Sequence, residues 1–155
     1  MTPPIRFLVS ANDGQGVTLT ASEQALLSGE SDGQPGEAIG LLSDTALAFH
    51  VLWLFPADDM LPMVSTFSKD GALIKAVCLA MGECHSDACY TCQETAMVDE
   101  QLRVLTTDTV KDCACDSTHN PIAGTCRRYV KVCEGLITEK GTFMAPVRDL
   151  ELSVD

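Results

Sequence analysis

The sequence predicts a mostly β fold, a single-domain antiparallel sandwich or open barrel with one or two short helices and a Cys-rich C-terminal half. Short apolar runs rich in β-branched and aromatic residues recur along the chain, and clusters of Gly, Pro, Asn and Asp separate them. This pattern predicts about eight strands, as in sandwiches and barrels. With 155 residues and 46% apolar residues, the chain is long enough to bury a true core.

The cysteines divide the sequence into two parts. Residues 1–77 form a β-rich half without cysteine, and residues 78–155 form a β-rich half that contains all eight cysteines. We expect the two halves to form one compact unit. Clustering of this kind predicts that bound metal or disulfides crosslink the second half.

The first elements are predicted from turn and capping signals. Residues 5–10 and 17–20 are expected to pair as a hairpin across the Gly-containing turn at 12–16. Thr20 and Glu23 have the spacing of a capping box, which begins a short helix, and Gly29 can end that helix in the left-handed conformation. Residues 28–40 are rich in glycine and predict a loop.

The middle of the chain contains its most apolar run. Residues 46–55 read as a buried strand, in which His50 is a hydrogen-bonded core imidazole and Trp53 a core anchor. Residues 62–67 are then expected to pair with residues 72–81, because Asp-Gly between two apolar runs is a strong hairpin signal.

The C-terminal elements are less uniform. Residues 94–105 are rich in helix formers and predict a helix, with a strand from Leu102 as the alternative. Residues 117–124 predict a loop. Residues 128–137 and 142–145 predict a hairpin that turns at Gly141, and residues 147–154 alternate as a strand does.

Charge excludes one class of partner. The net charge of −12 repels phosphate backbones, so we expect no nucleic acid partner. The basic residues Arg127, Arg128 and Lys131 are read as a solvated strand face.

Residues 46–55, the longest apolar run, are too short to span a bilayer. We therefore expect cytoplasmic synthesis without a signal peptide and incorporation into a larger particle or fibre.

The cysteine spacings favour zinc as one of two equally weighted alternatives. The unit C-x4-C-x2-C is followed by C-x-C, and paired thiolates on two turns are the usual ligands of structural zinc. We predict that four of five cysteines bind the ion: Cys84, Cys89, Cys92, Cys113 and Cys115. His85 and His119 are alternative ligands.

Disulfides are the other alternative. Eight cysteines allow 105 pairings, so the connectivity stays open. Cys78, Cys126 and Cys133 lie outside the zinc set and are disulfide candidates. Two further interpretations are less favoured: an iron–sulfur cluster on the C-x4-C-x2-C unit, which would make the protein an electron carrier, and a redox dithiol at Cys89 and Cys92.

The sequence contains no metalloprotease, nucleophile-elbow or P-loop motif. The unusual residues are those that can crosslink the chain. We therefore expect a non-enzymatic structural protein, an acidic subunit that packs against other protein subunits in a homo- or hetero-assembly.

Overall fold

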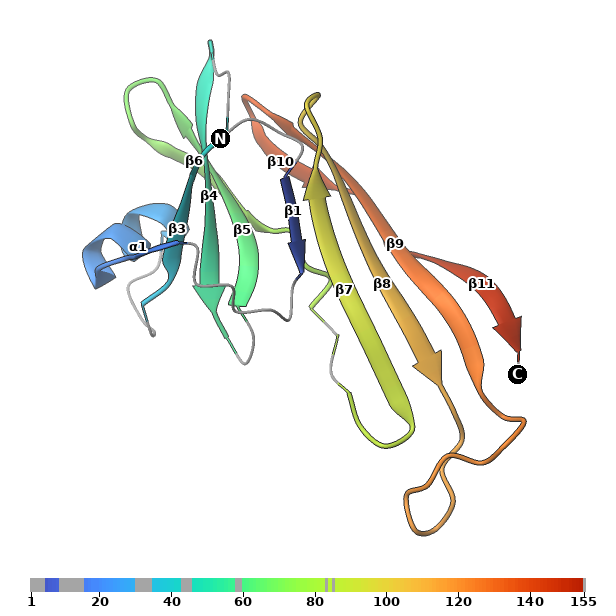
Figure 1. Cartoon of the computed structure of the whole chain (residues 1–155). Coiled ribbons are helices and arrows are strands. Elements are labelled where there is room, and N and C mark those ends of the chain that lie inside the picture. Colours follow the sequence, from blue (N-terminus) through green and yellow to red (C-terminus); the bar gives the residue numbers. More distant parts are fainter. Residues whose placement is uncertain are drawn as a thin grey trace.

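The computed structural model describes residues 5–8, 16–29, 35–42, 46–57, 60–82, 84 and 86–154, and gives the side chains of all of these except 5–8, 153 and 154. The fold is mostly β, as predicted, and consists of two antiparallel sheets and one short helix (Figure 1). The described residues form eleven strands, more than the eight or so that the sequence predicts.

The small sheet has five strands in the order β2-β3-β4-β5-β6. Its strands are β2 (Val17–Thr18), β3 (Glu37–Leu41), β4 (Ala48–Pro56), β5 (Met60–Ser68) and β6 (Leu73–Cys78). The predicted central strand is β4, which pairs along its whole length with β5. The predicted Asp-Gly hairpin joins β5 to β6, and Gly71 has the positive φ of 89° that this turn requires.

The large sheet has six strands, in which β9 pairs on one side with β8 and on the other with both β10 and β11. Its strands are β1 (Ile5–Leu8), β7 (Tyr90–Val98), β8 (Arg103–Asp112), β9 (Arg127–Thr138), β10 (Gly141–Met144) and β11 (Arg148–Val154). The hairpin of β9 and β10 and the final strand β11 confirm the predictions for these segments.

The core lies between the two sheets. The small sheet contributes Leu52 and Val64, and the large sheet contributes Ala96, Val98 and Val104, all of which are at most 2% exposed. The sheets also meet along one edge, where the Lys75 Nζ on β6 donates to the Thr142 carbonyl on β10 at 3.0 Å. Core residues from both sequence halves therefore pack together.

The helix α1 (Ala21–Ser28) covers the other face of the small sheet (Figure 1). Its capping box is present as predicted, and Gly29 ends it in the left-handed conformation. Leu27 packs with Trp53, whose indole N–H donates to the Ser65 hydroxyl at 2.8 Å. Because both faces of β4 are covered, its sequence is apolar without alternation.

The helix predicted over residues 94–105 is wrong. This segment forms the end of β7, a turn and the start of β8, and the strand alternative begins at Arg103. Asp99 makes the turn, because its carboxylate accepts the amide protons of Gln101 and Arg103, each at 2.9 Å. Pairing of β7 and β8 over nine residue pairs outweighs the weak helix propensity of the Glu and Gln residues.

The hairpin predicted over residues 5–20 is also wrong. β1 pairs with β7 in the large sheet, whereas β2 pairs with β3 in the small one. Residues 9–15, which contain most of the predicted turn, lie outside the described residues. The strands β1 and β2 therefore belong to different sheets.

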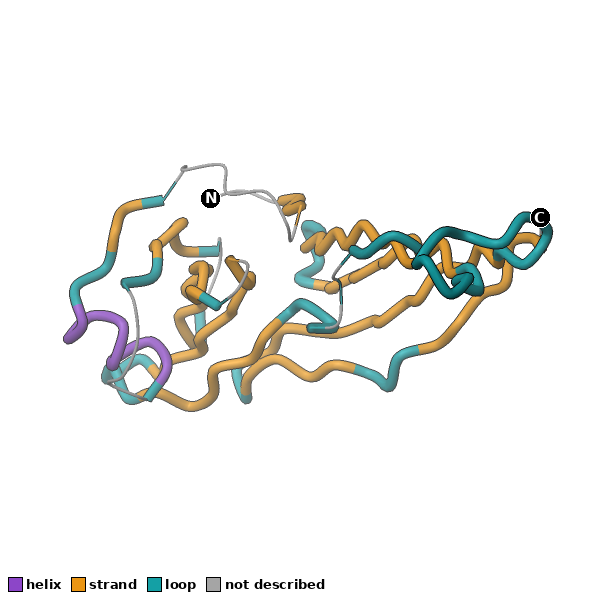
Figure 2. Tube along the Cα trace, turned by 90° about the horizontal axis from the view of Figure 1, so that it is seen from below, coloured by secondary structure: helices purple, strands orange, loops and turns teal. Residues whose placement is uncertain are grey.

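One end of the large sheet extends beyond the small sheet (Figure 2). We call this end the arm: residues 89–93, 109–130 and 148–154. The core residues that β7 and β8 contribute lie toward the opposite end of these strands, at Ala96, Val98 and Val104. Within the part of the chain that the structure describes, no second sheet packs against the arm, which contains most of the cysteines.

Candidate functional site: the disulfide-linked arm

Three pairs of cysteines lie at disulfide distance, and all of them connect to the arm. Cys84 is bonded to Cys92, Cys89 to Cys115, and Cys113 to Cys126, with Cα–Cα distances of 5.6, 5.9 and 4.0 Å. Each bridge restricts the unfolded chain, which stabilises the fold by about 3 kcal/mol for a closed loop of roughly 15 residues.

The bridges lie where the arm lacks core packing. The Cys84–Cys92 bridge fixes the segment between β6 and β7 to the large sheet, and Cys89–Cys115 joins the start of β7 to the connection after β8. Cys113–Cys126 closes that connection on itself. The bridges therefore hold together a part of the molecule that, among the described residues, contributes no buried residue to the core between the two sheets.

The loop between β8 and β9 has an internal hydrogen-bond network. The Asp116 carboxylate accepts from the amides of Thr118 and Asn120 at 2.8 and 2.9 Å, and these bonds, with that of the Thr118 hydroxyl, lower its pKa. The Thr125 hydroxyl donates to the Ile122 carbonyl at 2.7 Å. The exposed tip of the arm is thus built as one ordered loop.

Two carboxylates are buried where the arm joins the rest of the sheet. Glu94 on β7 and Asp108 on β8 are directly paired in the register, and they are 1% and 2% exposed. Glu94 Oε1 accepts the amide proton of Met81, which holds the segment after β6 against the large sheet. The neighbouring Thr106 hydroxyl donates to the Leu79 carbonyl at 2.6 Å.

Burial is the main cause of the pKa shifts at these carboxylates. It raises the pKa of Glu94 and of Asp108, because a charged carboxylate is poorly solvated there. The positive charge of Lys131, which is paired with Asp108 in the register, acts in the opposite direction on both groups. The sequence predicts a solvated basic face for Lys131. In the structure its charge instead acts on the two buried carboxylates.

The structure distributes the predicted zinc ligands among the three bridges. Cys84 and Cys92 are bonded to each other, while Cys89 and Cys113 are bonded to Cys115 and Cys126. Cys126 was expected outside the zinc set and lies in a bridge. Zinc binding by four of the five predicted cysteines stays a prediction.

The other two disulfide candidates carry free thiols. Cys78 lies at the end of β6 and is half-buried, and Cys133 lies on β9 and is buried. Burial raises the pKa of both thiols, so they stay protonated and are weak nucleophiles near neutral pH. The Cys133 Sγ lies 3.0 Å from the Ala145 carbonyl, to which it can donate.

Glu94 and Asp108 are not among the functional residues that the sequence predicts. Their signal is the alternation along β7, where Cys92, Glu94, Ala96 and Val98 share one face. The helix interpretation of residues 94–105 hid this period.

Within the described residues, no helix is long and apolar enough to cross a membrane.

Comparison of the chain with protein-family models, with curated proteins and with solved structures finds no match.

Proposed function

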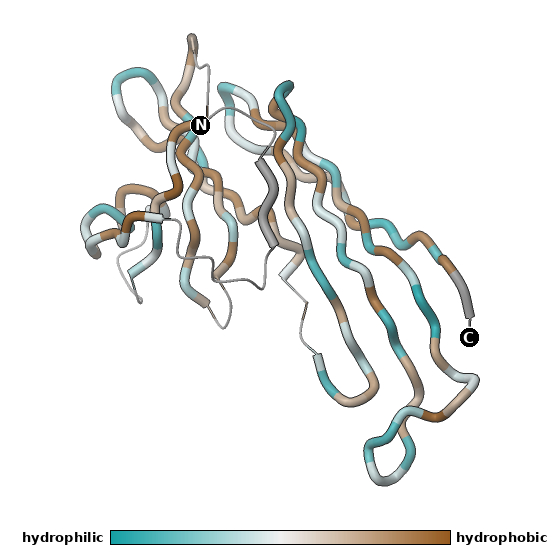
Figure 3. Tube along the Cα trace, viewed as in Figure 1, coloured by the Kyte–Doolittle hydropathy of each residue, from teal (hydrophilic) through white to brown (hydrophobic). Residues whose placement is uncertain are grey.

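We propose that this protein is a non-enzymatic structural subunit that packs against further copies of itself through the free edge of its large sheet. The observation that carries the proposal is a group of exposed apolar side chains on and beside β11, the strand at this edge. They are 45 to 61% exposed: Val147, Leu150 and Leu152 on β11 and the link before it, and Leu136 and Phe143 on the neighbouring strands β9 and β10. Apolar positions recur along these strands (Figure 3).

The strand β11 offers its backbone for pairing. It pairs with β9 on one side, and no described strand lies on its other side. An edge strand presents unpaired N–H and C=O groups and is a template for a strand of another chain. Antiparallel pairing of two β11 strands about a two-fold axis would join two large sheets into one.

The outer face of the large sheet adds surface next to this edge. A shallow depression of about 550 Å³ is lined by Met97, Leu105 and Leu136, with Arg103 and Glu134 among the polar groups. Leu136 belongs both to the depression and to the exposed apolar group. A neighbouring subunit on this edge could therefore bury apolar side chains as well as extend the sheet.

Charge opposes this association at low salt. Asp149 and Glu151 alternate with Leu150 and Leu152 on β11, and the whole chain carries −12. Copies of the chain repel each other, and salt screens such repulsion over about 8 Å at physiological ionic strength. We therefore expect self-association to strengthen as salt is raised from about 0.01 M to 0.15 M.

The bridges support the same role. An arm held by three bridges loses little conformational freedom when it binds a partner, so less of the interaction free energy is spent on ordering it. Both free thiols are held protonated by burial, which favours a structural over a catalytic role.

Mass photometry and sedimentation of the purified chain test the proposal. We expect dimers whose fraction increases with salt and with protein concentration, and we expect Leu150→Gln with Leu152→Gln to shift the population to monomers. The matched control is Leu26→Gln on α1, which replaces a comparably exposed leucine, 67% against 51% and 61%, and like the test variant leaves the net charge unchanged. A stable monomer at every salt concentration would contradict the proposal.

A further inference from the structure

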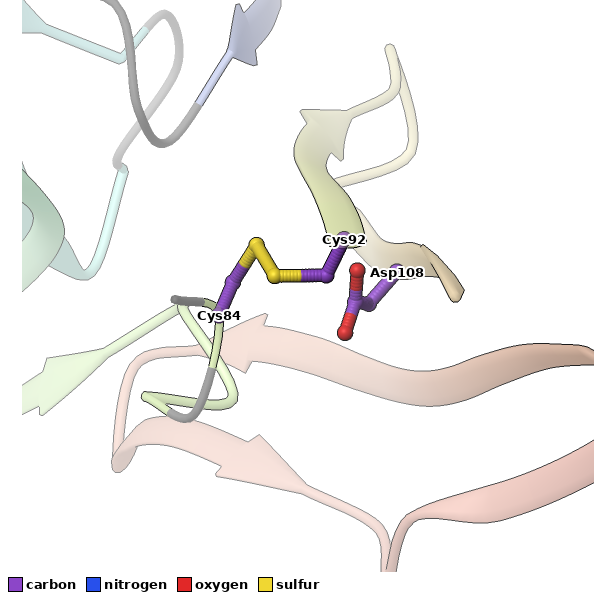
Figure 4. A group of neighbouring side chains, drawn as sticks. All are labelled: Cys84, Cys92 and Asp108. Atoms are coloured by element: carbon purple, nitrogen blue, oxygen red, sulfur yellow. A yellow bond between two sulfur atoms is a disulfide. The ribbon is translucent and has the colours of Figure 1, made fainter. Parts of the chain in front are cut away.

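The bridge between Cys84 and Cys92 lies against the buried carboxylate of Asp108. One ligand atom from each of these residues, the two sulfurs and a carboxylate oxygen, lies within 4.8 Å of the other two. Figure 4 shows the Asp108 carboxylate, on β8, beside the bridge that joins Cys92 of β7 to the segment after β6. Three elements thus converge on one point at the base of the arm.

The Asp108 carboxylate is incompletely satisfied. Its Oδ1 atom is buried and has no hydrogen-bond partner among the described residues, and the residue is only 2% exposed. An unpartnered buried oxygen costs about 1 to 3 kcal/mol, and more when it is charged. The site is therefore short of a positive charge or donor, although Lys131 acts on it from the same face of the sheet.

The same three ligand atoms suit a soft divalent cation once the sulfurs are separated. Tetrahedral zinc with bonds of about 2.0 to 2.3 Å places its ligand atoms roughly 3.3 to 3.8 Å apart. The three atoms already lie within 4.8 Å, so small side-chain rotations would reach this spacing. Two thiolates select zinc over magnesium or calcium, which prefer all-oxygen sites.

We propose that reduction of the Cys84–Cys92 bridge creates a zinc site whose ligands are Cys84, Cys92 and Asp108. In the reduction, two molecules of a small thiol become one disulfide, the bond between the two protein sulfurs breaks, and each sulfur takes up a proton. Zinc then displaces both protons and binds the two thiolates and the carboxylate. Solvent takes the fourth position, as in zinc sites with three protein ligands.

This bridge can be reached by a reductant from both of its sulfurs. Cys84 and Cys92 are both partly exposed, whereas each of the other bridges has one buried cysteine, Cys89 at 7% and Cys113 at 8% exposed, beside a more exposed partner. The site differs from the zinc set expected from spacing, because it uses two of those five cysteines and adds a carboxylate. It is also independent of the proposed assembly, which uses the opposite edge strand and the outer face of the sheet.

The test is zinc titration of the whole chain, after reduction with a phosphine and desalting without oxygen, in competition with a chromophoric chelator. We expect one tightly bound zinc per chain, no binding to the oxidised protein, loss of the site in Cys84→Ser, and affinity at least about 10-fold weaker in Asp108→Asn. Asp112→Asn, the same change four residues along β8, should leave the affinity unchanged. Cobalt in place of zinc should give thiolate charge-transfer bands.

Circular dichroism resolves the case in which reduction also unfolds the chain. If the reduced protein loses its β spectrum, zinc should restore it in the wild type and in Asp112→Asn but not in Asp108→Asn, because metal binding is then linked to folding. Zinc affinity or refolding that is the same in Asp108→Asn and in Cys84→Ser as in the wild type would place the ion elsewhere and overturn the proposal. The absence of zinc binding to the reduced protein would overturn it as well.

Discussion

The buried pair of Glu94 and Asp108 is the least expected feature at the scale of single residues. Two adjacent carboxylates at 1% and 2% exposure, with Lys131 on the same face, are costly to keep ionised. Glu94 is useful to the fold nonetheless, because its carboxylate binds the Met81 amide and so holds the segment between the two sheets. The same pair places a carboxylate beside the Cys84–Cys92 bridge.

This pair predicts a pH dependence of stability with a definite sign. Burial raises the pKa of Glu94 above its ordinary value of 4.5 and that of Asp108 above 3.8, so the folded state holds these protons to higher pH than the unfolded state does. The stability that they contribute is therefore present below those ordinary values and is lost as pH rises through the raised pKa values.

Urea unfolding of Glu94→Gln across the range from about pH 4 to pH 8 measures this effect. Glutamine keeps an acceptor for the Met81 amide and cannot ionise. We expect the free energy of unfolding of the variant, relative to the wild type, to increase as pH rises. The same substitution at the exposed Glu139, in the turn after β9, serves as the control. A Glu94→Gln difference that is flat with pH would show that the buried carboxylate is not the cause.

At the scale of elements, the loop between β8 and β9 shows what the bridges do. It extends from the end of the large sheet, most of its residues are exposed, and its two ends are joined by Cys113 and Cys126. Most of its hydrogen bonds lie within the loop, such as those to Asp116. A loop with so little burial depends on its crosslink for order.

Removal of this crosslink should destabilise the protein and loosen the loop. For Cys113→Ser with Cys126→Ser, whose sequence separation is 13, we expect a loss of about 3 kcal/mol in the free energy of unfolding and faster amide exchange over residues 114–125. Repeating the unfolding of both proteins with reductant provides the control, since all three bridges are then open and the wild type and the variant should be equally stable. Equal stability of both proteins without reductant would count against a structural role for this bridge.

Elements were predictable where local chemistry decides them. The capping box at Thr20, the Asp-Gly turn between β5 and β6, and the apolar run of β4 are all present in the structure. Residues 94–105 were not predictable in this way, because their strand form depends on pairing with β1, β8 and β9. The helix propensity of a segment contains no information about such pairing. The partner of β1 is likewise fixed by tertiary packing.

At the scale of the whole molecule, the protein is a sandwich with a crosslinked extension. The apolar core holds the two sheets together, and the bridges hold the arm, against which no other described sheet packs. The sequence located the crosslinked region, but it could not give the connectivity. Cys113 and Cys115 lie two residues apart and yet bond to Cys126 and Cys89, respectively, a pairing that depends on how β7, β8 and β9 are placed.

The central claim is that sulfur in this protein fastens the arm. Alkylation without reductant, followed by peptide mass spectrometry, tests it most directly. The account predicts three linked peptide pairs, Cys84 with Cys92, Cys89 with Cys115 and Cys113 with Cys126, and alkylation of Cys78 and Cys133 alone after unfolding. Alkylation of all eight cysteines in protein that was never reduced would contradict it.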